Sequence, residues 1–283
     1  MPRVRAWMLA TAVALLARAG VAAADGVPGA PPPPASKPPP PPVEEVELTG
    51  DAKEAHEKKV KAIVEAMNAE NNLEMLRGTT ERLGAEKKRE GRDALMRFTV
   101  GNKNQERITL AYEALGKIGD RKSVEFLCGK TALRSGDFLV QQTAAEVLGK
   151  IKSPLAIGPL LDVLTAPSTK IEVMGSAARA AAQSGPRDER VVETIFKLCD
   201  TGKDTIRANA LEAVGYLGSD KALDRLKDAL VHDKNTRCRG AAARGMKNSG
   251  RKELIPVLEA AVPAERALTV KDEIARAITE LSK

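Results

Sequence analysis

Aromatic and histidine residues are scarce in this 283-residue chain. It contains one Trp, two Tyr, four Phe and two His, although hydrophobic residues together make up 43%. Alanine, leucine and valine must therefore fill the core, and such side chains suit closely packed helices better than a sheet, which favours β-branched and aromatic residues. Because few aromatic rings are available for base stacking, we expect no nucleic-acid partner.

Sequence signatures of catalysis and metal binding are also missing. The chain has no G-x-S-x-G, P-loop, H-E-x-x-H or zinc-spacing motif, and its two histidines cannot provide the several convergent ligands that most metal sites need. The three cysteines, Cys128, Cys199 and Cys238, form no C-x-x-C pair and fall at apolar positions of the repeat described below, which predicts buried structural thiols. We therefore expect a protein that is not an enzyme and has no cofactor, metal or catalytic site.

Residues 1–24 are predicted to be a secretory signal peptide. Arg3 and Arg5 precede a largely apolar run over residues 6–17, and Ala22-Ala23-Ala24 forms an A-x-A cleavage site. A membrane anchor would need about 20 apolar residues, so cleavage is favoured and no transmembrane segment should remain. Loss of the three arginines in this segment lowers the formal charge from +7 to +4. The predicted location is periplasmic or extracellular.

A proline-rich disordered linker is predicted over residues 25–50. Ten of the 17 prolines lie between residues 27 and 43. Such a segment favours an extended polyproline II conformation and would form a stiff tether of roughly 50 Å. A spacer is the favoured interpretation, and a ligand for a proline-binding domain is the alternative.

The rest of the chain repeats itself. Five segments follow, some loosely, the pattern Ala-x-x-Ala-Leu-Gly-x-Ile-Gly, and a sixth ends the chain; they are residues 111–119, 144–152, 177–185, 210–218, 242–250 and 274–282. Their last positions are spaced by 33, 33, 33, 32 and 32 residues. A period of this length indicates stacked supersecondary units. A closing glycine occurs at four of the six positions and is expected to end a helix in the left-handed conformation.

Each of the first five segments is followed by apolar residues at helical spacing, so each unit is predicted to be a helical hairpin. The expected fold class is all-α, a right-handed α-solenoid of stacked two-helix units. Residues 104–283 would contain five full units and a C-terminal helix. Residues 51–103 would form an N-terminal capping helix and a degenerate unit.

The repeated unit resembles the HEAT-like repeats of the phycobilisome lyase type. Ile206-Arg207-Ala208-Asn209-Ala210 reproduces the start of that pattern most fully, and the resemblance covers residues ~104–283. It implies a binding surface. Two enzyme families with such repeats were considered, the bilin lyases and deoxyhypusine hydroxylase. The second holds two irons with several His-Glu pairs, of which this chain has only His56-Glu57.

The strongest surface feature is a basic stretch, residues 234–252, which has seven cations and no acid. The predicted partner-binding residues are Arg237, Arg239, Arg244, Lys247, Arg251 and Lys252. If the helix continues far enough, Arg237, Arg244 and Arg251 share a solvent-facing stripe, because they are seven residues apart. An acidic macromolecule would then be the partner. The alternative is a solvated face that pairs with Asp228, Asp233 and Glu253.

The function predicted from these features is a non-catalytic, exported scaffold that binds a protein or another macromolecular partner through its helical surface. A divergent HEAT-repeat enzyme or lyase-like enzyme accessory is the first alternative. A structural cell-envelope protein tethered by the proline-rich arm is the second. Partners that co-purify with the exported form would support the scaffold, and bound metal or pigment would support the enzyme.

Overall fold

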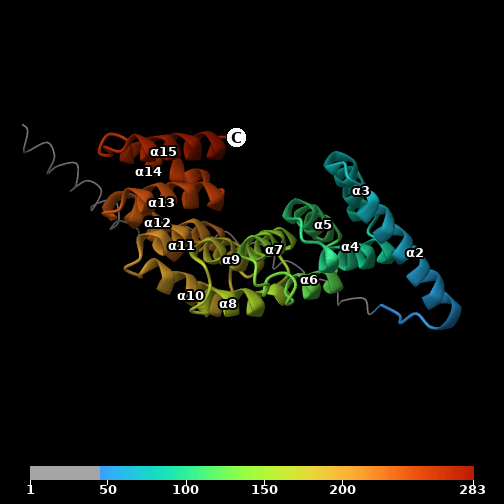
Figure 1. The fold of residues 1–283 in the computed structure, drawn as a ribbon. Coiled ribbons are helices and arrows are strands. Elements are labelled where there is room, and N and C mark those ends of the chain that lie inside the picture. Colours follow the sequence, from blue (N-terminus) through green and yellow to red (C-terminus); the bar gives the residue numbers. More distant parts are fainter. Residues whose placement is uncertain (1–44) are drawn as a thin grey trace, which may run out of the picture. The chain divides into compact units, whose positions relative to one another are not determined.

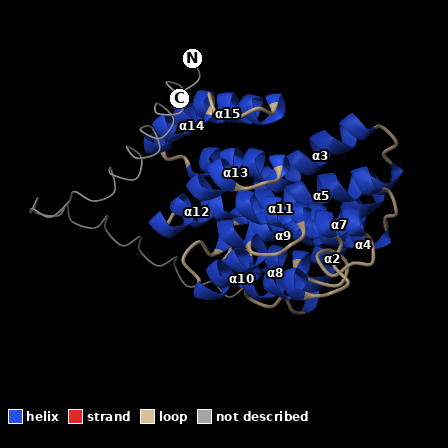
Figure 2. Cartoon of the chain, turned by 90° about the vertical axis from the view of Figure 1, so that its left-hand side faces the viewer, coloured by secondary structure: helices blue, strands red, loops and turns tan. Residues whose placement is uncertain are grey.

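A computed structural model describes residues 45–283 of the chain. The predicted signal peptide and nearly all of the predicted proline-rich linker lie outside these residues. Within them every regular element is helical, and residues 46–283 form one unit (Figures 1 and 2). The all-α prediction is therefore confirmed for the described part of the chain.

The helices of this unit form two rows. In the first row each helix packs directly on the next, and these first helices are α3 (Leu73–Glu86), α5 (Gln105–Ile118), α7 (Phe138–Ile151), α9 (Ile171–Ser184), α11 (Asp204–Val214), α13 (Thr236–Ser249) and α15 (Leu268–Leu281). The second helices return beside them; they are α4 (Arg89–Gly101), α6 (Arg121–Leu127), α8 (Ile157–Thr165), α10 (Glu189–Cys199), α12 (Asp220–His232) and α14 (Ile255–Ala261). Short 3-10 turns precede α8, follow α11 and precede α14, at Pro154–Ala156, Gly215–Leu217 and Lys252–Leu254.

The chain enters this arrangement through α2 (Gly50–Ala69), which packs on α4. The α3–α4 hairpin occupies the place of a further unit, because α3 packs on α5 as the later first helices pack on one another. A buried arginine joins α4 to the turn between α5 and α6. Arg92 of α4 is 1% exposed and pairs with Asp93 at 2.9 Å and with Asp120 at 2.7 Å.

Three of the four closing glycines adopt the left-handed conformation expected of them. Gly119, Gly218 and Gly250 adopt left-handed φ values of 64°, 65° and 66°, as the sequence predicts. Gly185 does not, because its φ is −145°. Pro186 follows it, and a residue before proline is driven towards extended backbone.

The first helices approach one another closely because small residues line their contacts. Most of their alanines are buried. The glycine three residues before the closing position of the repeat pattern also lets the neighbouring helix approach, because it has no Cβ atom. A Cβ atom on Gly116 would lie 2.7 Å from Val147 Cγ1, and one on Gly215 would lie 2.1 Å from the carbonyl oxygen of Gly245. The second helices have larger side chains and touch one another less. Neighbouring units are thus held together mainly through their first helices.

Arginines near the start of first helices strengthen this joint. Arg207 of α11 donates to the carbonyl of Thr201 at 3.1 Å and pairs with Asp233 at 2.9 Å. Arg239 of α13 donates to the carbonyl of Asp233 at 3.0 Å. Each guanidinium therefore ties its helix to the turn that precedes it.

Candidate functional site

The structure places the basic stretch on α13 and on the turn after it, and ion pairs within the chain occupy several of its cations. Arg239 pairs with Glu265 through two nitrogens, at 2.6 and 3.0 Å. Arg244 lies between two carboxylates, with Glu212 of α11 at 2.5 Å and Glu273 of α15 at 3.3 Å. These side chains connect adjacent units.

The predicted stripe of Arg237, Arg244 and Arg251 required the helix to continue as far as Arg251, and this condition is not met. Helix α13 ends at Ser249 and Gly250 turns the chain, so Arg251 lies outside the helix. Its guanidinium pairs with Glu253 at 2.9 Å and donates to the carbonyl of Gly218 at 2.9 Å. Arg237 is exposed and donates to the hydroxyl of Thr205 at 3.1 Å.

The pairing of Arg239 with Glu265 has a measurable electrostatic effect. The hydrogen bonds from Arg239, together with backbone N–H donors of Ala267 and Arg266, lower the pKa of Glu265 to about 2, against the effect of burial. The same bond raises the pKa of Arg239. This pair is therefore charged across the whole physiological range and is part of the fold.

Two of the three lysines of the basic stretch, Lys247 and Lys252, lie elsewhere, in a hollow between the end of α13 and α15. We call it the basic hollow. It has a volume of about 440 Å³, and the charged side chains that line it are Lys247, Lys252, Arg276, Lys283 and Glu280. Four cations thus face one carboxylate. Arg276 and Lys283 come from α15 and the residues after it, far from the stretch in sequence, and sequence reasoning did not include them.

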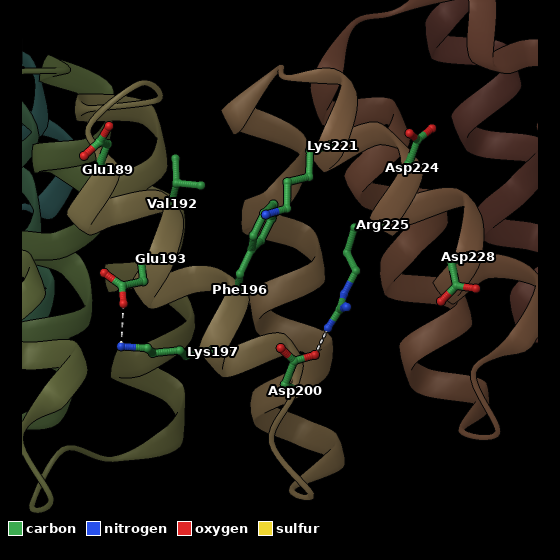
Figure 3. Close-up of a pocket in the computed structure, with 10 residues that line it drawn as sticks. All are labelled: Glu189, Val192, Glu193, Phe196, Lys197, Asp200, Lys221, Asp224, Arg225 and Asp228. Atoms are coloured by element: carbon green, nitrogen blue, oxygen red, sulfur yellow. Dashed lines mark hydrogen bonds and ion pairs between the residues drawn. The ribbon is translucent and has the colours of Figure 1, made fainter.

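A second concave surface, which the sequence did not reveal, lies between α10 and α12. Figure 3 shows this α10–α12 groove, with Lys221 and Arg225 of α12 directed towards α10. Its volume is about 770 Å³. The backbones of α10 and α12 approach each other slightly less closely than those of α8 and α10 or of α12 and α14. The groove is the space between these two backbones, and side chains span it, since Lys221 lies over Phe196 and Arg225 pairs with Asp200.

The floor of the groove is apolar and its walls are charged. Val192 and Phe196, one turn apart on α10, are half-buried, and the ammonium of Lys221 lies 5.2 Å from the centre of the Phe196 ring. The acidic lining residues are Glu189, Glu193, Asp200, Asp224 and Asp228, and the basic ones are Lys197, Lys221 and Arg225. Five carboxylates against three cations give the groove a formal charge of −2.

The three cysteines are buried and unpaired, as the sequence predicts. Burial raises the pKa of Cys199 to about 12, and those of Cys128 and Cys238 to about 11 each. The thiol is consequently protonated at neutral pH and is a poor nucleophile.

The described residues contain no group of three or more His, Cys, Asp or Glu side chains that could hold a metal ion. His56 lies on α2 and bonds to Asp93 at 2.9 Å, whereas His232 lies on α12 and bonds to Asp228 at 2.9 Å. Within residues 45–283, no helix has the length and apolar character that crossing a membrane requires.

Together, the stacked hairpins and the surface sites on them define an all-helical repeat protein. The family of HEAT repeats matches residues 110–172, 166–247 and 192–279, which together span more than half of the chain. The chain therefore belongs to the HEAT-repeat family, as the sequence resemblance indicated.

Solved structures similar to this chain are distant in sequence. The complex of CpcE and CpcF of phycocyanin lyase from Nostoc sp. PCC7120 is 17% identical, with a TM-score of 0.47, over 88% of this chain and 100% of that one. An archaeal HEAT-like repeats protein from Thermococcus onnurineus NA1 is 14% identical, with a TM-score of 0.46, over 79% and 97%. Human deoxyhypusine hydroxylase is 14% identical, with a TM-score of 0.39, over 81% and 98%. No curated protein matches the chain.

Proposed function

We propose that this protein is an exported, non-catalytic scaffold that binds an acidic segment of a partner protein at the basic hollow. The observation that carries the proposal is the convergence of four cations on one concave surface of about 440 Å³ with a single carboxylate among them. HEAT-repeat surfaces are suited to this role, because stacked units offer extended surfaces for binding other chains.

Within the basic stretch, the proposal rests on Lys247 and Lys252, which line the hollow. Neither has an ion pair within 4.0 Å among residues 45–283, although Glu280 exerts some attraction on Lys247. Arg276 pairs with Glu273 at 3.4 Å and Lys283 pairs with Glu280 at 2.7 Å, and both cations are largely exposed. Exposed pairs of this kind are weak, so these cations can also turn towards an incoming carboxylate.

The remaining predicted cations have a structural role in this proposal. Arg239 and Arg244 are committed to carboxylates of neighbouring units, and Arg251 to the turn before α12. Arg237 is exposed on the first turn of α13 and could add to the attraction without lining the hollow. An acidic partner would therefore be recognised mainly by the C-terminal part of the basic stretch.

A non-catalytic role is supported by the state of the reactive side chains. The thiols have raised pKa values, which make them poor nucleophiles. The two histidines lie at separate sites, where His56 is bonded to Asp93 and His232 to Asp228. Export is supported by the sequence of residues 1–24 alone. An enzyme accessory and a structural cell-envelope protein are the competing functions.

The test is co-purification of the exported chain with its partner, comparing wild type with the double variant Lys247→Gln/Lys252→Gln. A matched control removes two other exposed lysines, in Lys150→Gln/Lys203→Gln. We expect the hollow variant to lose most of its partner and the control to keep it. The wild-type interaction should weaken as salt is added, because exposed charges are screened beyond a Debye length of about 8 Å.

Equal recovery with both variants would refute the hollow as the docking site. Recovery of bound pigment or metal with the wild-type chain would favour an enzyme or its accessory. Recovery only with insoluble envelope material, regardless of either variant, would favour a structural protein.

A further inference from the structure

The α10–α12 groove differs from an ordinary small-molecule pocket. Such pockets are mostly enclosed and lined predominantly by apolar side chains, with a few polar groups. Here eight of the ten lining residues are charged, and they continue along both helices (Figure 3). A surface of this kind suits a chain segment that runs along the groove with charged side chains of its own.

Part of the charge in the groove is already balanced, by one ion pair within α10 and one that crosses the groove. Glu193 pairs with Lys197 at 2.8 Å on α10, and Arg225 of α12 reaches across to pair with Asp200. Lys221 is held above the Phe196 ring instead of a carboxylate. The basic side chains that line the groove are thus all engaged.

The carboxylates that remain lie on both walls. Glu189 of α10 is exposed and has no ion pair among residues 45–283. Asp224 and Asp228 of α12 have only the local partners Lys227 at 3.0 Å and His232 at 2.9 Å, on the same helix and at exposed positions. Because exposed pairs of this kind contribute little, both aspartates can accept hydrogen bonds from a ligand.

The apolar floor supplies the second element of recognition. Val192 and Phe196 are half-buried, and Phe196 packs against the core of the unit. An aromatic ring fixed from below presents a rigid surface with little conformational entropy to lose, which is typical of residues that anchor a bound chain. Lys221 covers part of the Phe196 ring, so one apolar side chain of a ligand would pack on Val192 and on the part of the ring that stays exposed, while its cations meet the walls.

We propose that the α10–α12 groove is a docking site for an extended basic segment of a partner protein, with lysine or arginine side chains at Glu189 and Asp224 and one apolar side chain over Val192 and the part of Phe196 that Lys221 leaves exposed. The groove and the basic hollow are formed by different helices and carry opposite charge. The proposal is therefore independent of the acidic partner assigned to the hollow.

The experiment measures binding of short fluorescent peptides to the full exported chain by fluorescence anisotropy. The peptides carry lysines, arginines and a single leucine or phenylalanine at varied spacings, and matched peptides replace the cations with glutamate. We expect the wild-type protein to bind at least one basic peptide about tenfold more tightly than its acidic counterpart, and less tightly as salt is added.

Two variants locate the binding. Glu189→Lys/Asp224→Lys reverses charge on both walls and should weaken basic-peptide binding about tenfold, as expected for charge repulsion at a contact. Glu106→Lys/Glu172→Lys reverses two exposed charges on the first helices and should leave binding unchanged. Phe196→Ala should weaken binding of the peptide with an apolar residue and have little effect on the same peptide with serine in its place.

The absence of any basic peptide that binds more tightly than its acidic counterpart would overturn the proposal. Equal loss with the groove and control charge variants would also overturn it, since attraction would then be general rather than local. Phe196 is half-buried, so Phe196→Ala is interpreted only if its circular dichroism spectrum and melting temperature match those of wild type. The charge variants are at exposed positions and decide the question in either case.

Discussion

Replacement of Gly215 by alanine should separate α11 from α13 and destabilise the protein. The added Cβ would lie 2.1 Å from the carbonyl oxygen of Gly245, whereas ordinary contact begins near 3.4 Å. The two backbones must therefore move apart by about 1.3 Å. A flexible side chain at the contact could turn away instead, but here the obstructing atom belongs to the backbone. Reciprocal crowding confirms the close approach, since a Cβ on Gly245 would lie 2.6 Å from the carbonyl of Leu211.

The expected magnitude follows from two opposing effects. Overpacking of this kind costs about 3 kcal/mol, at the upper end of the usual range, because both sides of the contact are backbone. Alanine recovers about 0.5–1 kcal/mol of conformational entropy relative to glycine. The net loss of about 2 kcal/mol corresponds to a fall in melting temperature of roughly 4–8 °C for a domain of this size.

The matched control is Gly78→Ala on α3, where a Cβ has no neighbour within 4 Å. This substitution should raise the melting temperature by about 1–3 °C, because only the entropic gain remains. Thermal unfolding followed by circular dichroism measures both. If Gly215→Ala is as stable as Gly78→Ala, the first helices are not in the close contact described here.

Four further outcomes are expected. Glu265 contributes stability that is complete above its ordinary pKa of 4.5 and is lost as pH falls towards about 2, so Glu265→Gln should lower the melting temperature at pH 7 and reduce its decline over that interval. The three cysteines should resist a thiol reagent in the native protein and react on unfolding, and rapid labelling at neutral pH would contradict their burial. Deletion of the whole unit 171–203 should leave a soluble helical protein, whereas deletion of half of it should cause aggregation; equal solubility would show that the unit boundaries are misplaced. Mass spectrometry of the exported protein should find Asp25 at the N-terminus, and an intact Met1 would refute cleavage.

Much of the fold could be predicted because the same residue pattern recurs in every unit. Small residues recur at the start of each matching segment, and apolar residues follow at helical spacing, so helix type and order were predictable. The reason for the glycine three residues before the closing position could not be predicted. Gly116 and Gly215 appear as helix-weakening residues in sequence, and only the structure shows the neighbouring backbone or side chain that leaves no room for a Cβ.

The charged surface was predicted less well, because ion pairs depend on residues one unit away. Glu212 and Glu273, the partners of Arg244, are 32 and 29 residues distant, whereas the expected partners were acids close to the basic stretch. A signal was present. Arg179, Glu212 and Arg244 occupy the same position in successive units and alternate in charge, and Arg179 pairs with Glu212 at 3.3 Å.

The α10–α12 groove could not be derived from the sequence, because the period of the repeat does not give the distance between neighbouring second helices. Phe196 appears in sequence as one more apolar residue of a helix, although it forms the floor of the groove. Its half-exposed position results from the separation of α10 and α12, which is a property of packing in three dimensions.

The most direct test of the proposed function is hydrogen–deuterium exchange of the exported chain with and without its co-purified partner. We expect slower exchange in residues 247–252 and in the last turn of α15 on binding, with little change in α5 and α7. Slower exchange confined to α5 and α7, with the basic hollow unchanged, would contradict it.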